Sequence, residues 1–129
     1  MNQRTVLVVE DDEDILSLVS KRLVLDGFDV VVARDGEDAL KLAQERKPDI
    51  AVLDLGLPGL DGIDVLRGIR ADKALSGMIV ILLTARAQEA DVRRGFEAGA
   101  DAYIRKPFSP TKLSESVSDL VKRHASGTV

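Results

Sequence analysis

The chain has 129 residues and a formal net charge of −4, and its content of 45% hydrophobic and 31% charged residues is typical of a single globular domain. The absence of cysteine and the presence of one histidine exclude disulfides, thiolate metal sites and multi-histidine zinc sites, while the net charge argues against broad electrostatic binding of nucleic acid. No apolar run reaches the roughly 18 residues of a membrane-spanning helix, and the first residues lack the apolar region of a signal peptide, so we expect a cytoplasmic protein without membrane association.

Short apolar runs and helical patterns alternate five times along the chain. The apolar runs are bounded by turn residues or charges, which is typical of buried strands. They predict strands at residues 6–9, 28–33, 49–53, 78–83 and 102–104.

After each apolar run, apolar residues recur at the spacing of one helix face, which predicts five helices. The residues that mark the helix faces are Ile15, Leu18, Val19 and Leu23 in the first helix, Ala39, Leu40 and Ala43 in the second, Ile63, Leu66 and Ile69 or Arg70 in the third, and Leu113, Val117, Leu120 and Val121 in the fifth. Gly27 should end the first helix, Asp35 should cap the second, and the second should end before Pro48.

The fourth helix, over residues 88–98, is the weakest of the five. Gly95 lies in its interior, where glycine costs about 1 kcal/mol relative to alanine. Its large apolar anchors are Val92 and Phe96. An element with so few buried contacts belongs to the less stable part of a domain, so we expect this helix to be able to move.

Strands that alternate with helices and read as uninterrupted apolar runs form a parallel sheet covered by helices on both faces. Five strands with right-handed crossovers fit a flavodoxin-like, doubly wound α/β fold with strand order 2-1-3-4-5. In this fold, ligands bind at the carboxyl ends of the strands, where the strand order reverses. We expect one domain over residues 1–124 and a flexible tail over residues 125–129.

Four of the five predicted strands end in a polar group that can take part in chemistry. Glu10 and Asp11 follow the first strand, Asp54 the third, Thr84 the fourth and Lys106 the fifth, whereas the second strand ends without a comparable group. Two carboxylates about 5 Å apart repel by roughly 3 kcal/mol at an effective dielectric of about 20, so protonation or a cation must offset the repulsion. An all-oxygen site with room for water suits Mg²⁺. With a hydroxyl and an ammonium beside it, such a site can receive a phosphoryl group, which Asp54 can attack.

Each of these groups also has a purely structural interpretation. The acidic run at residues 10–14 can be a solvated helix start, because acids are stabilised at the amino end of a helix dipole. Asp12 is expected to be a helix cap or loop acid, and not a third acid of the site. Tyr103 can pack on the sheet edge with its hydroxyl in water, and His124 is expected to be exposed without a catalytic role. The coincidence of suitable groups at four strand ends favours the functional interpretation.

Four stretches of the sequence, taken together, resemble the receiver domain of bacterial two-component response regulators. They are VLVVEDDEDI at 6–15, DIAVLDLGLPGLDG at 49–62, ILLTAR at 81–86 and GADAYIRKPFSP at 99–110. They occur in the order and spacing of that family, and the resemblance covers residues 4 to 124. It implies a phosphorylation-dependent signalling switch of a phosphorelay rather than an enzyme.

The resemblance also implies a role for each residue of the site. Asp54 would accept a phosphoryl group from the phosphohistidine of a sensor histidine kinase or a phosphotransfer protein. Mg²⁺ would be bound directly by Asp11, Asp54 and the backbone carbonyl of Gly56, with Glu10 acting through water. The remaining roles are those of the residues that contact the phosphoryl group, Thr84 and Lys106, and of the aromatic switch residue, Tyr103.

Further expectations from the resemblance concern regulation. The Lys106–Pro107 peptide bond would be cis, and Gly56 and Arg86 would tune a slow self-dephosphorylation. Phosphorylation would repack the face formed by the fourth helix, the fifth strand and the fifth helix, which controls a partner or effector domain. A phosphorylation-linked homodimer through this face stays open, because Lys112 and Ser116 depart from the charges that the related branch of the family carries there.

Two other classes of function fit the sequence less well than the receiver. A phosphatase with an aspartate nucleophile needs a second acid two residues after it, and Gly56 occupies that position. An adaptor that uses the fold only as a scaffold would have no need of the full set of polar groups. The sequence names neither the kinase nor the output, and it shows no glycine-rich nucleotide-binding motif after the first strand.

Overall fold

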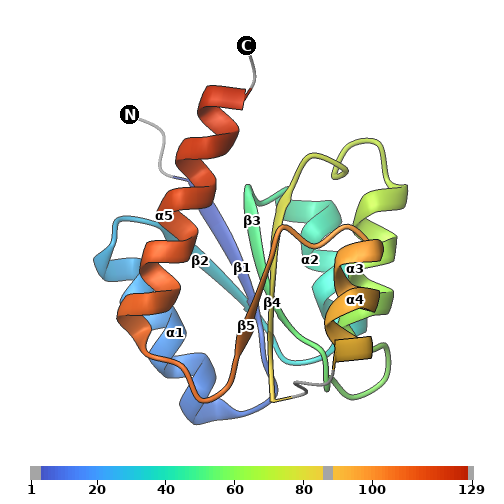
Figure 1. Ribbon diagram of the computed structural model, residues 1–129, viewed down its shortest axis with the longest axis horizontal. Helices are drawn as coiled ribbons and strands as arrows, with labels where there is room; N and C mark the ends of the chain where they lie inside the picture. The colour runs from blue at the N-terminus through green and yellow to red at the C-terminus, as the bar shows by residue number, and fades with distance from the viewer. Residues whose placement is uncertain (1–3, 86–88, 128–129) are drawn as a thin grey trace.

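The computed structural model describes residues 4–85 and 89–127, and within them the chain forms a parallel sheet enclosed by helices (Figure 1). The elements in chain order are β1 (Thr5–Val9), α1 (Glu13–Leu25), β2 (Asp29–Ala33), α2 (Gly36–Arg46), β3 (Ile50–Asp54), α3 (Gly62–Ala71), β4 (Ile79–Thr84), α4 (Glu89–Glu97), β5 (Ala102–Arg105) and α5 (Pro110–Gly127). Among these described helices, none is both long enough and apolar enough to cross a bilayer.

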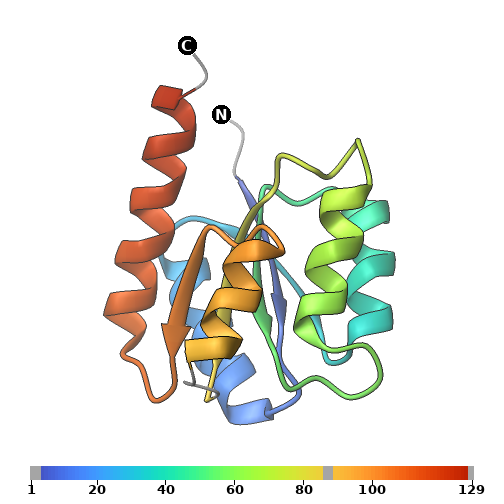
Figure 2. The ribbon, with the colours of Figure 1, turned by 45° about the vertical axis from the view of Figure 1, so that its right-hand side comes forward.

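The sheet has the order β2-β1-β3-β4-β5, and every neighbouring pair of strands is parallel. Helices α1 and α5 cover one face, and α2, α3 and α4 cover the other (Figures 1 and 2). The predicted doubly wound fold is therefore confirmed, with the strand order reversing between β1 and β3.

Alternate residues of the central strands enter two separate cores, because successive side chains of a strand point to opposite faces. Leu7 and Leu53 pack with α2 and α3, whereas Val8 and Val52 pack with α1 and α5. Every residue of β3 and β4 is buried. This two-sided burial explains why these strands read as unbroken apolar runs.

Aspartates begin three of the helices. Asp12, Asp35 and Asp61 each accept a backbone N–H from the first turn of α1, α2 and α3, respectively. Each such cap is worth about 1 kcal/mol, because it satisfies a donor that the helix itself cannot pair. The expectation that Asp12 is a helix cap is confirmed.

The inward face of α1 differs from the predicted one. Leu18 is 47% exposed, and the buried residues are Leu16, Val19 and Leu23. The sequence allowed two apolar stripes that share Val19 and Leu23, and the packing of α1 against the sheet selected the stripe that contains Leu16. Leu18 instead lines a hollow beside the carboxyl end of β5.

The carboxyl end of the chain also differs from expectation. Helix α5 continues through Gly127, so residues 125–127 belong to a helix and not to the predicted tail. No glycine or proline interrupts the chain between Pro110 and Gly127, so nothing in the sequence breaks the helix earlier.

Helix α4 lies against the sheet through its glycine. Gly95 is buried, and a Cβ there would lie 2.6 Å from Cδ1 of Leu82 on β4. Phe96, a predicted anchor, is 47% exposed, and Val92 is half-buried. Gly95, which lowers the helix propensity of α4, is thus also its point of close approach to the sheet. The scarcity of apolar contacts agrees with the prediction of a weakly held helix.

Arg70, at the end of α3, ties two loops together. Its guanidinium donates to the carbonyl oxygen of Gly99 from Nε (3.0 Å) and Nη2 (2.7 Å), and to those of Ser76 and Met78 from Nη1. It also pairs with Asp101 at 3.0 Å. The segment that joins α4 to β5 is therefore fixed to α3, whatever the rest of α4 does.

Replacing Arg70 with methionine keeps the length of the side chain and removes all of these donors. We expect Arg70→Met to lower the free energy of unfolding by about 2–4 kcal/mol, because several partly buried carbonyl oxygens lose their partner. Urea denaturation measures this, with the exposed Arg67→Met on the same helix as a matched control that should change it by less than about 0.5 kcal/mol. Equal losses in the two variants would contradict this assignment.

Candidate functional site

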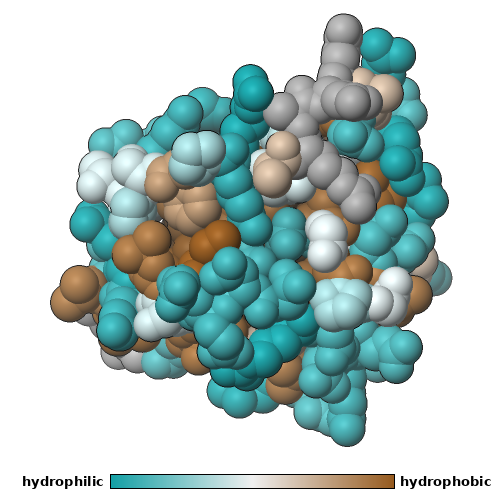
Figure 3. Space-filling view, turned by 90° about the horizontal axis from the view of Figure 1, so that it is seen from below, coloured by the Kyte–Doolittle hydropathy of each residue, from teal (hydrophilic) through white to brown (hydrophobic). Residues whose placement is uncertain are grey.

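The carboxyl ends of the strands meet at the lower edge of the molecule in Figure 1, and Figure 3 views this edge from below. Hydrophilic side chains gather across the middle of that face, beside hydrophobic patches. Residues Val9 of β1 and Leu53 of β3 are paired in register, so Glu10 and Asp54, the next residues along, emerge side by side. Asp11 directly follows Glu10, at the point where the strand order of the sheet reverses.

Three carboxylates converge at this point. Glu10, Asp11 and Asp54 each offer an oxygen, and these oxygens lie within 4.8 Å of one another. Glu10 and Asp54 are buried, with 1% and 7% of their surfaces exposed, whereas Asp11 is exposed. Among the described residues this is the one cluster of acids with such geometry. Hard oxygen ligands that are partly open to water suit a hard dication.

The loop after β3 turns back close to Asp54. The backbone N–H of Gly56 donates to Oδ1 of Asp54 at 3.3 Å, and a Cβ at Gly56 would lie 3.9 Å from Oδ2. Gly56 is exposed, so solvent reaches the carboxylate from this side. A side chain at position 56 would stand between Asp54 and water.

A lysine and a threonine complete the predicted set. Nζ of Lys106 lies 2.5 Å from Oε1 of Glu10 and 3.6 Å from Oδ2 of Asp54. Thr84 is buried at the end of β4, and its carbonyl oxygen accepts the backbone N–H of Lys106 at 2.9 Å. The Lys106–Pro107 peptide bond is cis, which confirms that prediction. One ammonium thus faces two of the three carboxylates.

The environment of Glu10 shifts its protonation. Burial raises its pKa above the usual value of 4.5, and the neighbouring charge of Asp54 acts in the same direction. Hydrogen bonds from Lys106 and from the backbone N–H of Asp12, the latter at 3.2 Å, oppose the shift without cancelling it. The carboxylate of Glu10 therefore accepts hydrogen bonds from two donors, the Lys106 ammonium and the backbone N–H of Asp12.

The structure adds one charged pair that the sequence did not indicate. Arg34, just after β2, forms an ion pair with Glu13 on the exposed rim of the site, and this lowers the pKa of Glu13. The second strand was expected to contribute nothing comparable. The sequence does show a charged residue, Arg34, directly after the second apolar run. Only the order of the strands in the sheet places this residue beside the start of α1.

Three other residues singled out in the sequence do not line the carboxylate cluster as described. Tyr103 is half-buried on β5, where it packs beside Gly95 of α4. Arg86 lies outside the described residues. His124 is exposed, as expected, and its Nε2 lies 3.8 Å from Oδ1 of Asp101.

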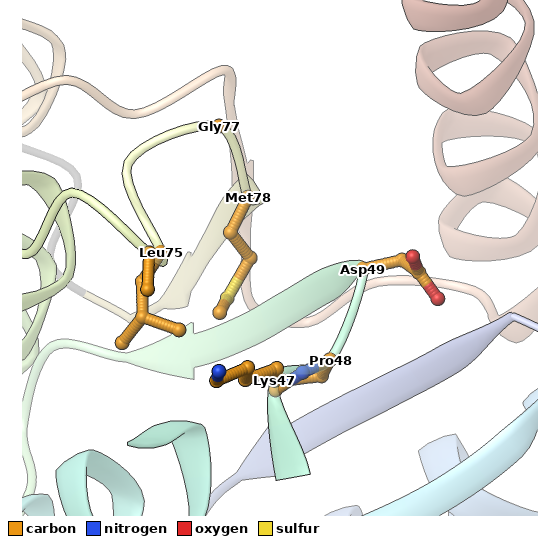
Figure 4. A pocket seen from close by; sticks show the side chains of 7 residues that line it. Lys47, Pro48, Asp49, Leu75, Gly77 and Met78 are labelled. Carbon is orange, nitrogen blue, oxygen red and sulfur yellow. The ribbon is translucent and has the colours of Figure 1, made fainter. Parts of the chain in front are cut away.

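Two of the hollows in the described part of the chain illustrate the surroundings of the sheet ends, and neither is lined by Glu10, Asp11 or Asp54. One, of about 390 Å³, is lined by Ile15, Leu18, Ala85, Lys106, Pro107 and Phe108 and opens beside the site. The other, of about 250 Å³, lies at the opposite edge of the sheet, and Figure 4 shows Leu75 and Met78 lining it. There the carboxylate of Asp49 points away from these side chains and accepts the backbone N–H of Thr5 at 2.9 Å (Figure 4). The carboxylate cluster thus stays the candidate site.

Comparison with known proteins places this geometry in a family. The family model described as the response regulator receiver domain matches residues 6–118. The chain is 44% identical over 123 residues to the alkaline phosphatase synthesis transcriptional regulatory protein PhoP of Bacillus subtilis, covering 95% of this chain and 50% of that protein. It is also 44% identical over 124 residues to the DNA-binding response regulator MtrA of Mycobacterium tuberculosis, covering 96% of this chain and 53% of MtrA.

Solved structures agree with this assignment. A CheY-like receiver domain protein from Methanospirillum hungatei has a TM-score of 0.91 at 28% identity, covering 98% of this chain and 99% of that one. The BeF3-activated receiver domain of DrrB has a TM-score of 0.85 at 36% identity, covering 95% and 100%.

The chain belongs to the response regulator receiver domain family, a family of switches in two-component signalling. It spans about half the length of the curated relatives described above.

The raised pKa of Glu10 predicts a pH-dependent stability. Because the folded state binds this proton more tightly than the unfolded chain, the contribution of Glu10 is fully present below pH 4.5 and is lost as the pH rises through the raised pKa. In metal-free buffer we expect the wild type to lose stability relative to Glu10→Gln across this window, measured by urea unfolding at successive pH values. The exposed Glu45→Gln controls for the loss of one acidic charge. Parallel curves for the wild type and Glu10→Gln would contradict the burial argument.

Proposed function

We propose that Asp54 is the phosphoacceptor of a Mg²⁺-dependent signalling switch, and that its donor is the phosphohistidine of a sensor histidine kinase or phosphotransfer protein. The observation that carries this proposal is the convergence of three carboxylates with the Lys106 ammonium at one edge of the sheet. Glu10, Asp11 and Asp54, with the carbonyl of Gly56, would hold Mg²⁺, which supplies positive charge to the phosphoryl oxygens.

The proposed reaction follows from the groups present. An oxygen of Asp54 attacks phosphorus, the new O–P bond forms as the P–N bond to the donor imidazole breaks, and the imidazole leaves with the bonding electrons. Lys106 exchanges part of its contact with Glu10 for a phosphoryl oxygen, and the hydroxyl of Thr84 donates to another. Burial of Asp54 and Thr84 makes these interactions stronger than they would be in water.

The proposal predicts covalent labelling at one residue. Incubation with acetyl phosphate and Mg²⁺ should add about 80 daltons, the mass of one phosphoryl group, to the intact chain. The gain should vanish in Asp54→Asn and when EDTA removes the metal. Intact-mass spectrometry measures it, with the cap variant Asp61→Asn as a control that keeps the label.

Label that persists in Asp54→Asn would contradict the assignment. A separate incubation with a phosphate ester tests the alternative of a phosphatase with an aspartate nucleophile, because such an enzyme would turn over the ester repeatedly, whereas a receiver would be labelled about once per chain. Gly56 stands where that class needs its second acid, which favours the phosphoacceptor. In the proposed function the domain is not an enzyme, and Gly56 and Arg86 tune a slow self-dephosphorylation.

The proposed output is a repacking of the face formed by α4, β5 and α5. The weakly held α4 and the half-buried Tyr103 support this, since they touch each other at Gly95 and follow β4, which carries Thr84. A phosphoryl group adds roughly −1.5 to −2 charges, which is enough to bias a surface with two arrangements.

Hydrogen exchange tests this switch. Adding beryllofluoride and Mg²⁺, which mimic the phosphoryl group, should change amide protection across residues 84–110, whereas protection in β1 and α2 should stay constant. Unchanged protection across residues 84–110 would refute the proposed repacking.

The proposal about partners is based on the names of the relatives. MtrA is named as a DNA-binding response regulator and PhoP as a transcriptional regulatory protein, each about twice the length of this chain. We infer that residues 1–124 form a signal-receiving domain of the cytoplasm that controls an effector and does not itself bind nucleic acid or membrane. A phosphorylation-linked homodimer through the α4–β5–α5 face stays part of the proposal.

A further inference from the structure

Two glycines outside the predicted site border the loop that carries Gly56. This loop, residues 55–61, leaves Asp54 and ends at the start of α3. Gly62 is the first residue of α3 and Gly36 is the first residue of α2, and both are buried. Neither has the positive φ that favours glycine, in contrast to Gly59 inside the loop (φ 74°). Glycine is therefore required at these two positions because there is no space for a side chain.

Gly62 lies against the end of β3. A Cβ at this position would overlap the carbonyl oxygen of Asp54 and lie 2.9 Å from Cα of Leu55. Both of these are backbone atoms, so no side-chain rotation can make room. The backbone N–H of Gly62 also donates to the carbonyl oxygen of Leu55 at 3.2 Å. Any side chain here displaces the backbone that carries the Asp54 carboxylate.

Gly36 lies against the other end of the loop. A Cβ there would overlap the carbonyl oxygen of Leu60 and lie 2.6 Å from its Cβ. Helix α2 is held against the sheet on the other side, because Ala39 is fully buried in the core between them. A side chain at position 36 therefore displaces the loop and not the helix.

We propose that Gly36 and Gly62 are positioning residues that set the place of the Mg²⁺ ligands, an inference that rests on the proposed function. Mg²⁺ demands near-ideal octahedral geometry at about 2.0–2.1 Å, so displacements of a few tenths of an ångström at Asp54 or at the carbonyl of Gly56 weaken its binding. Helix α2 sends no polar group into the site. It acts on the metal ligands through the contact of Gly36 with Leu60.

The test is the Mg²⁺ dependence of stability. A ligand that binds the folded state stabilises it in proportion to RT ln(1 + [L]/Kd), so the Mg²⁺ concentration at which stabilisation begins reports Kd. Urea unfolding is measured over a series of Mg²⁺ concentrations at constant ionic strength. In Gly36→Ala and Gly62→Ala we expect this onset to rise at least tenfold, whereas a purely structural effect would lower stability equally at every concentration.

Two variants serve as matched controls. Gly77→Ala adds a methyl group where nothing lies within 4 Å. Leu60→Ala removes most of a side chain but keeps both atoms that face Gly36. Both controls should begin to respond at the wild-type Mg²⁺ concentration, even though Leu60→Ala is less stable. A variant that is unfolded in water is measured in sucrose, which favours the compact state.

The outcomes separate the two proposals. If Mg²⁺ stabilises the wild type and both glycine variants at the same concentration, the positioning role is refuted and the phosphoacceptor function is untouched. If Mg²⁺ does not stabilise even the wild type, the metal site of the proposed function fails. A shifted onset in the glycine variants with an unshifted onset in the controls supports the inference.

Discussion

The pairing of two central strands forces two carboxylates to lie close together, and the rest of the site depends on this. Glu10 and Asp54 follow residues that are paired in register on β1 and β3, so they cannot separate without unpairing strands whose paired residues are all buried. At an effective dielectric of about 20, two carboxylates about 5 Å apart repel by roughly 3 kcal/mol, an energy that burial of a few apolar side chains outweighs. Lys106 offsets part of the repulsion, and the remaining repulsion favours binding of a cation. Burial of the apolar strands thus fixes the arrangement of charges at the edge of the sheet.

The molecule divides into a rigid part and a weakly held part around this site. The acids and the loop of residues 55–61 are supported by β1, β3 and the buried starts of α2 and α3, where contacts are close and involve backbone atoms. On the other side, α4 rests on a glycine, and its Phe96 is about half exposed. Arg70 fixes the end of α4 to α3, so a rearrangement of this helix would leave its carboxyl end in place. Because the two parts differ in this way, a small electrostatic change at the site can move α4 without displacing the carboxylates.

Sequence reasoning failed where one local pattern fitted two packings. The apolar residues of α1 form two overlapping stripes, and only contact with the sheet selects Leu16 over Leu18. Gly95 was interpreted through helix propensity, but its role is a close approach to Leu82, which no local rule contains. The ion pair between Arg34 and Glu13 joins residues that only the neighbouring places of β1 and β2 bring together. Each of these depends on distances between segments that lie far apart along the chain.

The sequence by itself determined the order of strands and helices, two of the three aspartate caps, the two-sided burial of the central strands and the identity of the acids at their ends. These follow from local periodicity, from glycine and proline punctuation and from the rule that parallel strands end at a common edge. Only the tertiary structure decided which face of α1 is buried, how α4 meets the sheet, that Lys106 lies closer to Glu10 than to Asp54, and that two helix-starting glycines touch the loop after β3. The reason is that close packing is resolved at tenths of an ångström between segments whose separation no sequence pattern encodes.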